Sequence, residues 1–499
     1  MWYELALHYI VLTFGIRELV VYKLEGRRLV KKPDMALALG NAFTLLVTND
    51  GDIYSFGDNA SGQLGINNTI THRLPTLLDH GTVFDGKDVV MVSAGDVHSS
   101  CITSDGSLWL WGYNRDGGLG LGDFNNRLVP VRIPRAHFNN SHVLMVACGC
   151  SFTVVLTIAG KVWTCGDGEL GQLGHGNQED QNQLIEIDAV RFQNMEIGMV
   201  AVGTRHSLAI TRKSGILYTW GSNTDGQLGL GYKSNYVTVP CAIPQQDFDG
   251  DAVASMHAHA DYTMAVSVDG DLWACGGASG VGIPGTGSGN RQSSTMIRIG
   301  GDELFGEGGV RMVSCGSSYA LIVACNGLAW STQRMRFRVQ AVETEQDVGD
   351  PYRPCVLPRA LFGDEDVLVA GATHTHNGIL TRSGRLYTWG ENMQQANSSG
   401  IGYDLQVVMQ DGDWFPQPIP LTAFQNIAVG RWHRMTTERA EALIMGRYAH
   451  FAATGEETAY SDEKFKDDVL QAMMEDLMLF KPPKTASPGL KNMLGVAPS

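Results

Sequence analysis

The chain has 499 residues, of which 43% are hydrophobic and only 18% are charged, so it is long enough to bury a large core. Its 52 acidic residues outnumber its 37 basic ones, which gives a net charge of −15. Because binding to phosphate backbones draws on lysine and arginine, this balance argues against a general nucleic-acid-binding surface. The nine cysteines are scattered, which favours a reducing compartment over a disulfide framework.

The N-terminal extension, residues 1–34, precedes the repetitive part of the chain. Its apolar start, Met1 to Phe14, lacks a cationic beginning and is too short to span a bilayer, so neither a secretory signal nor a membrane partner is predicted. The run Glu4 to Leu12 is interpreted as a short helix, and Leu19 to Lys23 as a strand. These features predict an intracellular protein, in the cytoplasm or the nucleus, that is not secreted.

From residue 35 onward, one pattern recurs about every 55 residues. A turn residue and a glycine are followed by an alternating strand that ends on an aromatic residue and a glycine, as in Ser214 to Gly221. The first five copies end at Gly57, Gly112, Gly166, Gly221 and Gly276. A worn sixth copy ends at Ser331, and a seventh ends at Gly390. A fixed period of this size indicates one structural unit copied around a ring or along a stack.

Two further signatures accompany the strand. Gly-Gln-Leu-Gly follows it at 62–65, 171–174 and 226–229, and a near copy lies at 117–120. Between copies, a β-branched run ends in a small residue and glycine, often with histidine three residues after the glycine: His98, His206, His374 and His433. Weaker copies have another residue at the histidine position: Phe43, Phe152, Asp261 and Tyr319. Four short strands separated by Gly, Asn and Asp turns fill each period, which predicts the blades of a β-propeller.

These motifs resemble the repeat of the regulator of chromosome condensation family over residues 35–446. The resemblance implies an all-β fold, a seven-bladed β-propeller of four-stranded antiparallel blades. Extra half-units at Met35 to Asn49 and Ala440 to Gly446 leave an eighth blade open. In a ring, the two chain ends can also share one blade and close it.

No catalytic residue, metal site or cofactor is predicted. The four histidines recur at one turn of different blades, so they are interpreted as side chains that fix the turn by bonding a neighbouring backbone group. The close pair Cys148 and Cys150 lacks a second pair of metal ligands. The tryptophans are interpreted as core residues: Trp109, Trp111, Trp220, Trp273, Trp330 and Trp389.

The main functional hypothesis is a non-enzymatic scaffold that presents loops to a protein partner, because binding usually lies on loops held by a rigid frame. The irregular loops at 278–291, 334–354 and 391–414 are the predicted contacts. The candidate partner-binding residues are Asp96, Arg205, Arg291, Arg334, Arg336, Trp414 and Arg431.

Two alternatives remain open. The resemblance implies guanine-nucleotide exchange on a Ran-like small GTPase, through carboxylates at the Gly-x-x-His turns. Asp96 fits the first such turn, but Ser151 stands where a second aspartate is expected. The other alternative is a ubiquitin-ligase substrate adaptor, because the N-terminal extension resembles a degenerate F-box that lacks the Leu-Pro start and the later tryptophan.

The C-terminal region, residues 447–499, differs in kind from the repeats. Ser461 offers a helix N-cap with acids in the first turn. The spacing of Phe465, Val469, Met473, Leu477 and Phe480 predicts an amphipathic helix with one apolar face. That face docks on the propeller or on a partner, and the tail after residue 483 is expected to be mobile.

Overall fold

The computed structural model describes most of the chain between residues 36 and 390. The described ranges are 36–48, 51–78, 80–277, 283–286, 292–317, 319–332, 353–373, 376–382 and 385–390, together with six short strands given below. All of these residues belong to one compact unit, which spans residues 1–425.

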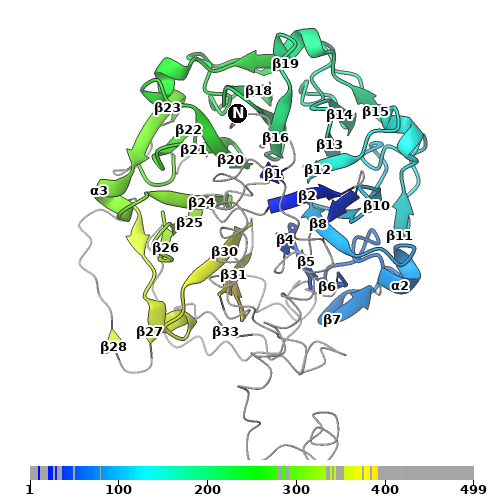
Figure 1. The fold of residues 1–499 in the computed structure, drawn as a ribbon, viewed down its shortest axis with the longest axis horizontal. Coiled ribbons are helices and arrows are strands. Elements are labelled where there is room, and N and C mark those ends of the chain that lie inside the picture. The colour runs from blue at the N-terminus through cyan, green and yellow to red at the C-terminus, as the bar shows by residue number, and fades with distance from the viewer. Residues whose placement is uncertain are drawn as a thin grey trace, which may run out of the picture. The chain divides into compact units, whose positions relative to one another are not determined.

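Within the described ranges, seven four-stranded antiparallel sheets form the propeller that the repeat predicts, and each sheet is one blade (Figure 1). Strands that follow one another along the chain lie side by side in a blade, except that a small hairpin is inserted in blade 6. Residues of the front half-unit supply the first two strands of blade 1. The blade count is therefore seven, and the eight-bladed alternative is wrong.

The strands of each blade have the following bounds. Blade 1 contains β4 (Ala36–Leu39), β5 (Phe43–Val47), β6 (Ile53–Gly57) and β7 (His72–Leu78). Blade 2 contains β8 (Val89–Ala94), β9 (His98–Thr103), β10 (Leu108–Gly112) and β11 (Arg127–Arg132). Blade 3 contains β12 (Val143–Cys148), β13 (Phe152–Thr157), β14 (Val162–Gly166) and β15 (Gln181–Glu186). Blade 4 contains β16 (Ile197–Val202), β17 (His206–Thr211), β18 (Leu217–Ser222) and β19 (Tyr236–Ala242).

The remaining blades follow the same order. Blade 5 contains β20 (Val253–His259), β21 (Tyr262–Ser267), β22 (Leu272–Gly276) and β23 (Ser293–Gly300). Blade 6 contains β24 (Val310–Cys315), β25 (Ala320–Ala324), β26 (Ala329–Ser331) and β29 (Cys355–Val356), with the hairpin β27 (Arg338–Val339) and β28 (Val342–Glu343) inserted. Blade 7 contains β30 (Val367–Ala372), β31 (His376–Thr381), β32 (Leu386–Gly390) and β33 (Gln417–Pro418).

The ring closes by packing. The first strand of each blade contacts the first strand of the next, and β30 of blade 7 contacts β4 of blade 1. Each blade takes its four strands from one continuous stretch of chain, so no described blade is shared between the two chain ends. The expectation that the two chain ends share one blade and so close the ring is therefore wrong for the described blades.

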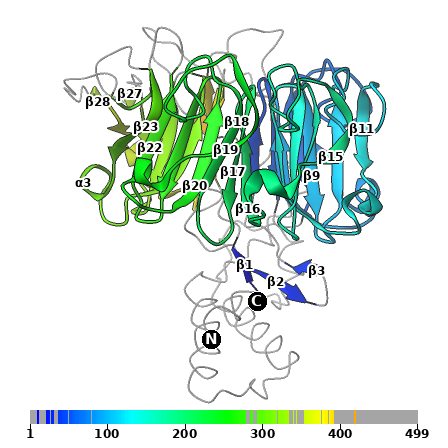
Figure 2. The same ribbon diagram turned by 90° about the horizontal axis from the view of Figure 1, so that it is seen from above.

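The strands of every blade run roughly along the ring axis, so the segments that join them gather at two opposite faces (Figure 2). The loop face carries the connections between first and second strands and between third and fourth strands, such as residues 95–97 and 113–126. The helix face carries the other connections, such as residues 104–107 and 133–142.

One-turn helices join the blades on the helix face, which the repeat pattern did not predict: α2 (His80–Val83), η2 (Arg135–Phe138), η3 (Ala189–Phe192), η4 (Gln245–Phe248), α3 (Asp302–Phe305) and η5 (Arg359–Phe362). A buried phenylalanine at or just after each helix packs on an aromatic ring of a third strand. Phe248 lies 5.7 Å from Trp273 between ring centroids, with the planes at 74°, a T-shaped geometry that aromatic pairs favour. Phe138 and Trp163 form an equivalent pair.

The predicted core tryptophans lie in the blade interiors. Five of them are buried, with at most 7% of the residue exposed: Trp109, Trp111, Trp220, Trp273 and Trp389. The sixth, Trp330, is partly buried and packs edge-on against Phe305. Their interpretation as core residues is therefore confirmed.

The N-terminal extension contains a small antiparallel sheet of β1 (Tyr9–Val11), β2 (Val21–Glu25) and β3 (Arg28–Val30). The strand predicted from Leu19 to Lys23 agrees with β2. The helix predicted over Glu4 to Leu12 is wrong at Tyr9–Val11, where an aromatic residue and two β-branched residues favour a strand. No helix in the described part of the chain is long and apolar enough to cross a bilayer.

Candidate functional site

The Gly-x-x-His turns are joints between blades. A Cβ atom on Gly203 would lie 2.2 Å from Cε1 of His206, so only glycine leaves room for the ring. Nε2 of His206 lies 2.9 Å from Oγ1 of Thr263 in the next blade, and Nε2 of His98 lies 2.9 Å from Oγ1 of Thr153. The prediction that these histidines bond a neighbouring backbone group is therefore wrong, because their partners are hydroxyls of the next blade.

Each threonine hydroxyl in these contacts also donates a hydrogen bond to a backbone carbonyl. Thr153 Oγ1 donates to the carbonyl of Gly118 at 2.7 Å, and Thr263 Oγ1 donates to that of Gln227 at 2.8 Å. Since the hydroxyl hydrogen is used there, Nε2 of the histidine is the donor. Burial lowers the pKa of His98 to about 4 and that of His206 to about 3, so both rings are neutral and structural.

Backbone pairing changes which residue occupies the histidine position of the turn in blades 5 and 7. His98 pairs with Gly112 and His206 with Gly221, which are the glycines that end the third strands. In blade 5 the residue opposite Gly276 is Tyr262, not Asp261. In blade 7 the residue opposite Gly390 is His376, not His374.

The Gly-Gln-Leu-Gly signature is also structural. The indole nitrogen of Trp111 donates to the carbonyl of Gln63 at 2.8 Å, and that of Trp220 donates to the carbonyl of Gln172 at 2.9 Å. Ser99 Oγ donates to the same Gln63 carbonyl at 2.7 Å. Each signature loop is therefore fastened to the following blade, which holds the loop face rigid.

A cavity of about 330 Å³ lies along the ring axis. It is lined by the first strands of all seven blades, with apolar side chains such as Val90, Met145, Met199 and Met312. His257 also lines it, and its Nδ1 accepts a hydrogen bond from the backbone nitrogen of Cys315 at 3.1 Å. The lining is mostly apolar and does not assemble a set of catalytic groups.

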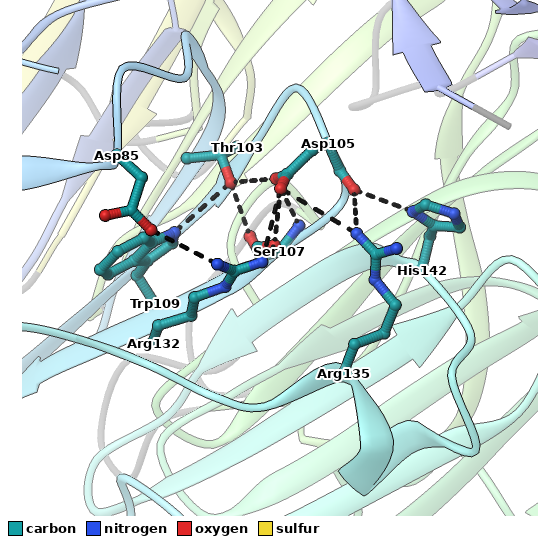
Figure 3. A network of polar contacts seen from close by, with 8 residues as sticks. All are labelled: Asp85, Thr103, Asp105, Ser107, Trp109, Arg132, Arg135 and His142. Carbon is teal, nitrogen blue, oxygen red and sulfur yellow. Dashed lines mark hydrogen bonds and ion pairs between the residues drawn. The ribbon is translucent and has the colours of Figure 1, made fainter. Parts of the chain in front are cut away.

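A dense polar network surrounds Asp105 on the helix face, and Figure 3 shows its members. Thr103 Oγ1 donates to the Asp105 carboxylate at 2.7 Å, and Ser107 Oγ donates at 3.0 Å. Although burial would raise it, these hydrogen bonds hold the pKa of Asp105 below its usual value. The Asp105 carbonyl bonds Arg135 and His142, each at 2.8 Å. The network ties the hairpin turn of blade 2 to the connection leading into blade 3.

Several charged side chains of the helix face are paired. Arg132 lies 3.3 Å from Asp85, Arg212 lies 3.2 Å from Glu196, and other pairs repeat this arrangement around the face: Lys161–Glu186, Arg298–Asp271, Arg359–Asp366 and Arg385–Glu365. These exposed pairs join neighbouring connections. Other carboxylates of the same face form no ion pair with a described cation: burial and the charges of Asp269, Asp271 and Asp249 raise the pKa of Asp251.

On the loop face, Arg127 pairs with Asp123 at 2.6 Å, whereas other charged side chains have no such partner. Five carboxylates of blades 2 to 5 form no ion pair with any described cation: Asp96, Asp116, Asp167, Asp225 and Asp261. The exposed guanidinium groups of Arg115 and Arg205 also lack a paired carboxylate among the described residues. Four of these carboxylates were not predicted, although Asp116 and Asp225 directly precede the signature glycine, a pattern that could have drawn attention to them.

The structure brings the predicted contact residues Asp96 and Arg205 together around Cys150. Burial, the Asp96 charge and a hydrogen bond to Asp96 raise the pKa of the Cys150 thiol to about 12, whereas Arg205 opposes this shift. Burial and Asp225 raise the pKa of Asp261, and Arg205 again opposes. The Cys150 thiol is therefore protonated and unsuited to nucleophilic chemistry.

Large apolar side chains are exposed on the same face. Ile70 is 66% exposed, Phe124 is 53% exposed and Tyr232 is 50% exposed, each in the connection between a third and a fourth strand. Exposed apolar groups beside unpaired charges are typical of a protein-binding surface.

The other predicted contacts, Arg291, Arg334, Arg336, Trp414 and Arg431, lie outside the described residues. The same holds for the apolar face of the C-terminal helix: Phe465, Val469, Met473, Leu477 and Phe480. These assignments, and the domain boundaries at 34/35 and 446/447, stay predictions.

The comparisons agree with this architecture. The family model of the RCC1-like domain matches residues 18–332, which is more than half of the chain. The chain belongs to the RCC1-like domain family, as its repeat indicates.

Curated relatives match over part of their length. The ultraviolet-B receptor UVR8 of Arabidopsis thaliana is 36% identical over 241 residues, which cover 48% of this chain and 52% of the receptor. The E3 ubiquitin-protein ligase HERC2 of Mus musculus is 29% identical over 304 residues, which cover 60% of this chain and 6% of the ligase. The match thus spans about half of the receptor and a small part of the ligase.

Solved structures show the same fold. Human WBSCR16 has a TM-score of 0.60 at 21% identity, covering 74% of this chain and 94% of that one. Yeast RCC1 (Prp20), solved with Kap60 bound, has a TM-score of 0.54 at 22% identity, covering 70% of this chain and 78% of that one. At these identities the likeness concerns the fold alone.

Proposed function

We propose that this protein is a non-enzymatic interaction scaffold inside the cell, in the cytoplasm or the nucleus, and that its loop face binds a protein partner. The observation that carries the proposal is the loop face of blades 2 to 5. There, five carboxylates and the guanidinium groups of Arg115 and Arg205 form no ion pair with a described residue, and exposed apolar side chains such as Phe124 lie on the same face.

The arrangement of the loop face suits a partner. Its turns are fixed by contacts between blades, so the half-buried Asp96 and the exposed Arg205 and Phe124 are presented with little loss of conformational entropy on binding. Unpaired charges favour selectivity and fast association with a surface of complementary potential. Fold and family membership favour a protein-interaction role and name no partner.

Photo-crosslinking tests the proposal. A photoreactive amino acid replaces Arg115 on the loop face or, as the matched control, Lys213 on the helix face; both residues are exposed. We expect a protein partner to crosslink through position 115 and not through position 213. Crosslinking only through position 213, or equally through both, would contradict the proposal.

A second candidate function is nucleotide exchange on a Ran-like GTPase. Asp96 lies on the loop face at the turn where the family resemblance places a carboxylate, and Prp20p of Saccharomyces cerevisiae, which shares this fold, has binding properties to Gsp1p and histones. Ser151 at the next turn weakens this candidate. Accelerated release of labelled GDP by the wild-type chain, lost in Asp96→Ala, would support it; unchanged release would exclude it for the GTPase tested.

The ubiquitin-ligase adaptor alternative has less support. HERC2 is named as a ubiquitin-protein ligase, but the matched part is 6% of that protein. The strands β1, β2 and β3 do not favour a helical F-box in the N-terminal extension.

A further inference from the structure

Four carboxylates of the loop face of blades 2 and 3 interact electrostatically, and we call them the acidic cluster: Asp116, Asp167, Glu169 and Asp180. Oδ1 of Asp180 accepts a hydrogen bond from the backbone nitrogen of Gly168, the residue after Asp167, at 2.8 Å. Asp167 lies at the centre of their electrostatic contacts. Burial raises its pKa, and the charges of the other three carboxylates raise it further, against one hydrogen bond from the backbone nitrogen of Glu169 at 2.9 Å. The folded chain therefore holds like charges together at a cost in stability.

A buried amide beside the cluster also lacks its usual partner. In blade 1, Nε2 of the signature glutamine Gln63 donates to the carboxylate of Asp58 at 2.9 Å. In blade 4, Nε2 of Gln227 donates to Oγ of Ser222 at 3.2 Å. The corresponding pair in blade 3 is Gln172 and Asp167.

In blade 3 this bond is missing. Gln172 has no exposed surface, its Oε1 accepts from the backbone nitrogen of Leu170 at 2.8 Å, and its Nε2 has no hydrogen-bond partner among the described residues. By equivalence with the other two blades, that nitrogen is directed at Asp167. A buried donor without an acceptor costs free energy comparable to a lost hydrogen bond. Asp167 is thus crowded by like charges at a place where a bond from Gln172 would have stabilised it.

The spacing of the cluster selects the kind of ligand. No group of three His, Cys, Asp or Glu side chains in the described part of the chain is close enough to hold a metal ion. Separated carboxylates fit several cations carried on one chain better than a single ion. The connection that carries Asp116 also exposes Phe124, whose ring offers a face to a cationic or apolar side chain.

We propose that the acidic cluster binds lysine or arginine side chains of an extended basic segment in a partner protein, with Asp167 as the central acceptor. This inference rests on the proposed function and adds the chemistry of the partner. An incoming cation neutralises the mutual repulsion and donates to the free oxygen of Asp167. The repulsion among the carboxylates of the free protein is relieved when the cation binds, and this relief contributes to the binding free energy.

The first test measures stability. In Asp167→Asn, the charge repulsion is removed, so we expect the melting temperature to rise by about 2 °C. Asp58→Asn is the matched control, because Asp58 already bonds Gln63, and its melting temperature should not rise. An equal rise in both variants, or a fall in Asp167→Asn, would overturn the frustration on which the inference depends.

The second test measures binding with a defined probe. A fluorescein-labelled peptide, Ala-Lys-Leu-Lys-Phe-Lys-Leu-Lys-Ala, is titrated with wild-type protein, Asp167→Asn, Asp58→Asn and the helix-face variant Glu196→Gln. We expect about tenfold weaker binding in Asp167→Asn and little change in the two controls. A peptide with glutamate in place of lysine should not bind.

Other outcomes overturn the inference. Equal affinity of all variants, equal binding of the acidic peptide, or no measurable binding of the basic peptide to wild type would each contradict it. Crosslinks through Arg115 combined with binding that does not depend on Asp167 would reject the basic segment but keep the loop-face scaffold. Binding that depends on Asp167 while all protein crosslinks come from Lys213 would keep the basic segment but reject the loop-face scaffold.

Discussion

Single residues determine how neighbouring blades are joined. Gly203 is needed for the space it leaves, because its backbone does not adopt the left-handed conformation that often explains a glycine. His206 fills that space and reaches Thr263 in the next blade. The recurring histidines look like a catalytic set in the sequence, but in the structure His98 and His206 join neighbouring blades.

Gly203→Ala should be strongly destabilising. The added Cβ would meet the His206 ring at 2.2 Å, and that ring is fixed by its bond to Thr263. We expect a loss of about 2 kcal/mol or more in the free energy of unfolding, measured by denaturant titration. Gly378→Ala is the control, because its nearest neighbour is the movable end of Leu37 at 3.1 Å. Equal losses in the two variants would contradict the steric account.

The buried histidines make stability depend on pH. Their pKa values in the fold, about 4 for His98 and about 3 for His206, lie below the 6.5 of an exposed side chain. Between these values the unfolded chain binds protons that the folded chain does not. Stability is therefore complete above pH 6.5 and falls toward pH 4, by up to about 1.4 kcal/mol per histidine per pH unit.

A double variant checks this pH dependence. His98→Phe combined with His206→Phe uses the residue type that blades 1 and 3 carry at this position, Phe43 and Phe152. Thermal melts at pH 7 and pH 5 should differ less in the double variant than in wild type. Some dependence should remain, because burial also lowers the pKa of His257 to about 4. An unchanged difference between the two pH values would show that these two rings do not titrate as described.

The structural role of these residues could be predicted from repetition, but their partners could not. His98 and Thr153 are 55 positions apart, and their contact exists only because consecutive blades lie side by side. Four of the five unpaired loop-face carboxylates were missed for a related reason. Whether Asp167 has a counter-ion depends on folded neighbours, and the periodicity of a sequence does not reveal it.

At the scale of elements, strands and blades follow from the pattern, whereas the short helices do not. A four-residue helix has no hydrophobic period to detect. A different signal was present: a proline four positions before phenylalanine at Pro134, Pro244 and Pro358. In each case the proline precedes a one-turn helix and the phenylalanine enters the core.

Phe248→Ala tests the importance of these helices. The ring is 1% exposed and packs edge-on against Trp273, so its removal leaves a cavity between two blades. We expect a loss of about 3–5 kcal/mol in the free energy of unfolding. Val190→Ala in η3 is the control, because Val190 is 67% exposed and should change stability little. A small loss of unfolding free energy in Phe248→Ala would mean that the short helices contribute little to the core.

At the scale of the whole propeller, both faces contribute contacts between blades, and we propose that the loop face is the one that binds a partner. The helix face carries paired charges and the aromatic contacts of the short helices. The loop face carries carboxylates without described counter-ions, exposed arginines and exposed apolar side chains on turns fastened to the next blade. Family membership predicts this frame, but the local differences among repeats determine which face is free to bind.

Hydrogen exchange of the protein with its crosslinked partner tests the central claim most directly. The account predicts slower amide exchange in loop-face segments 95–97, 113–126 and 167–180 when the partner is bound. The helix-face segments 133–142 and 187–196 should exchange at unchanged rates. Protection confined to the helix-face segments, with the loop face unchanged, would contradict the account.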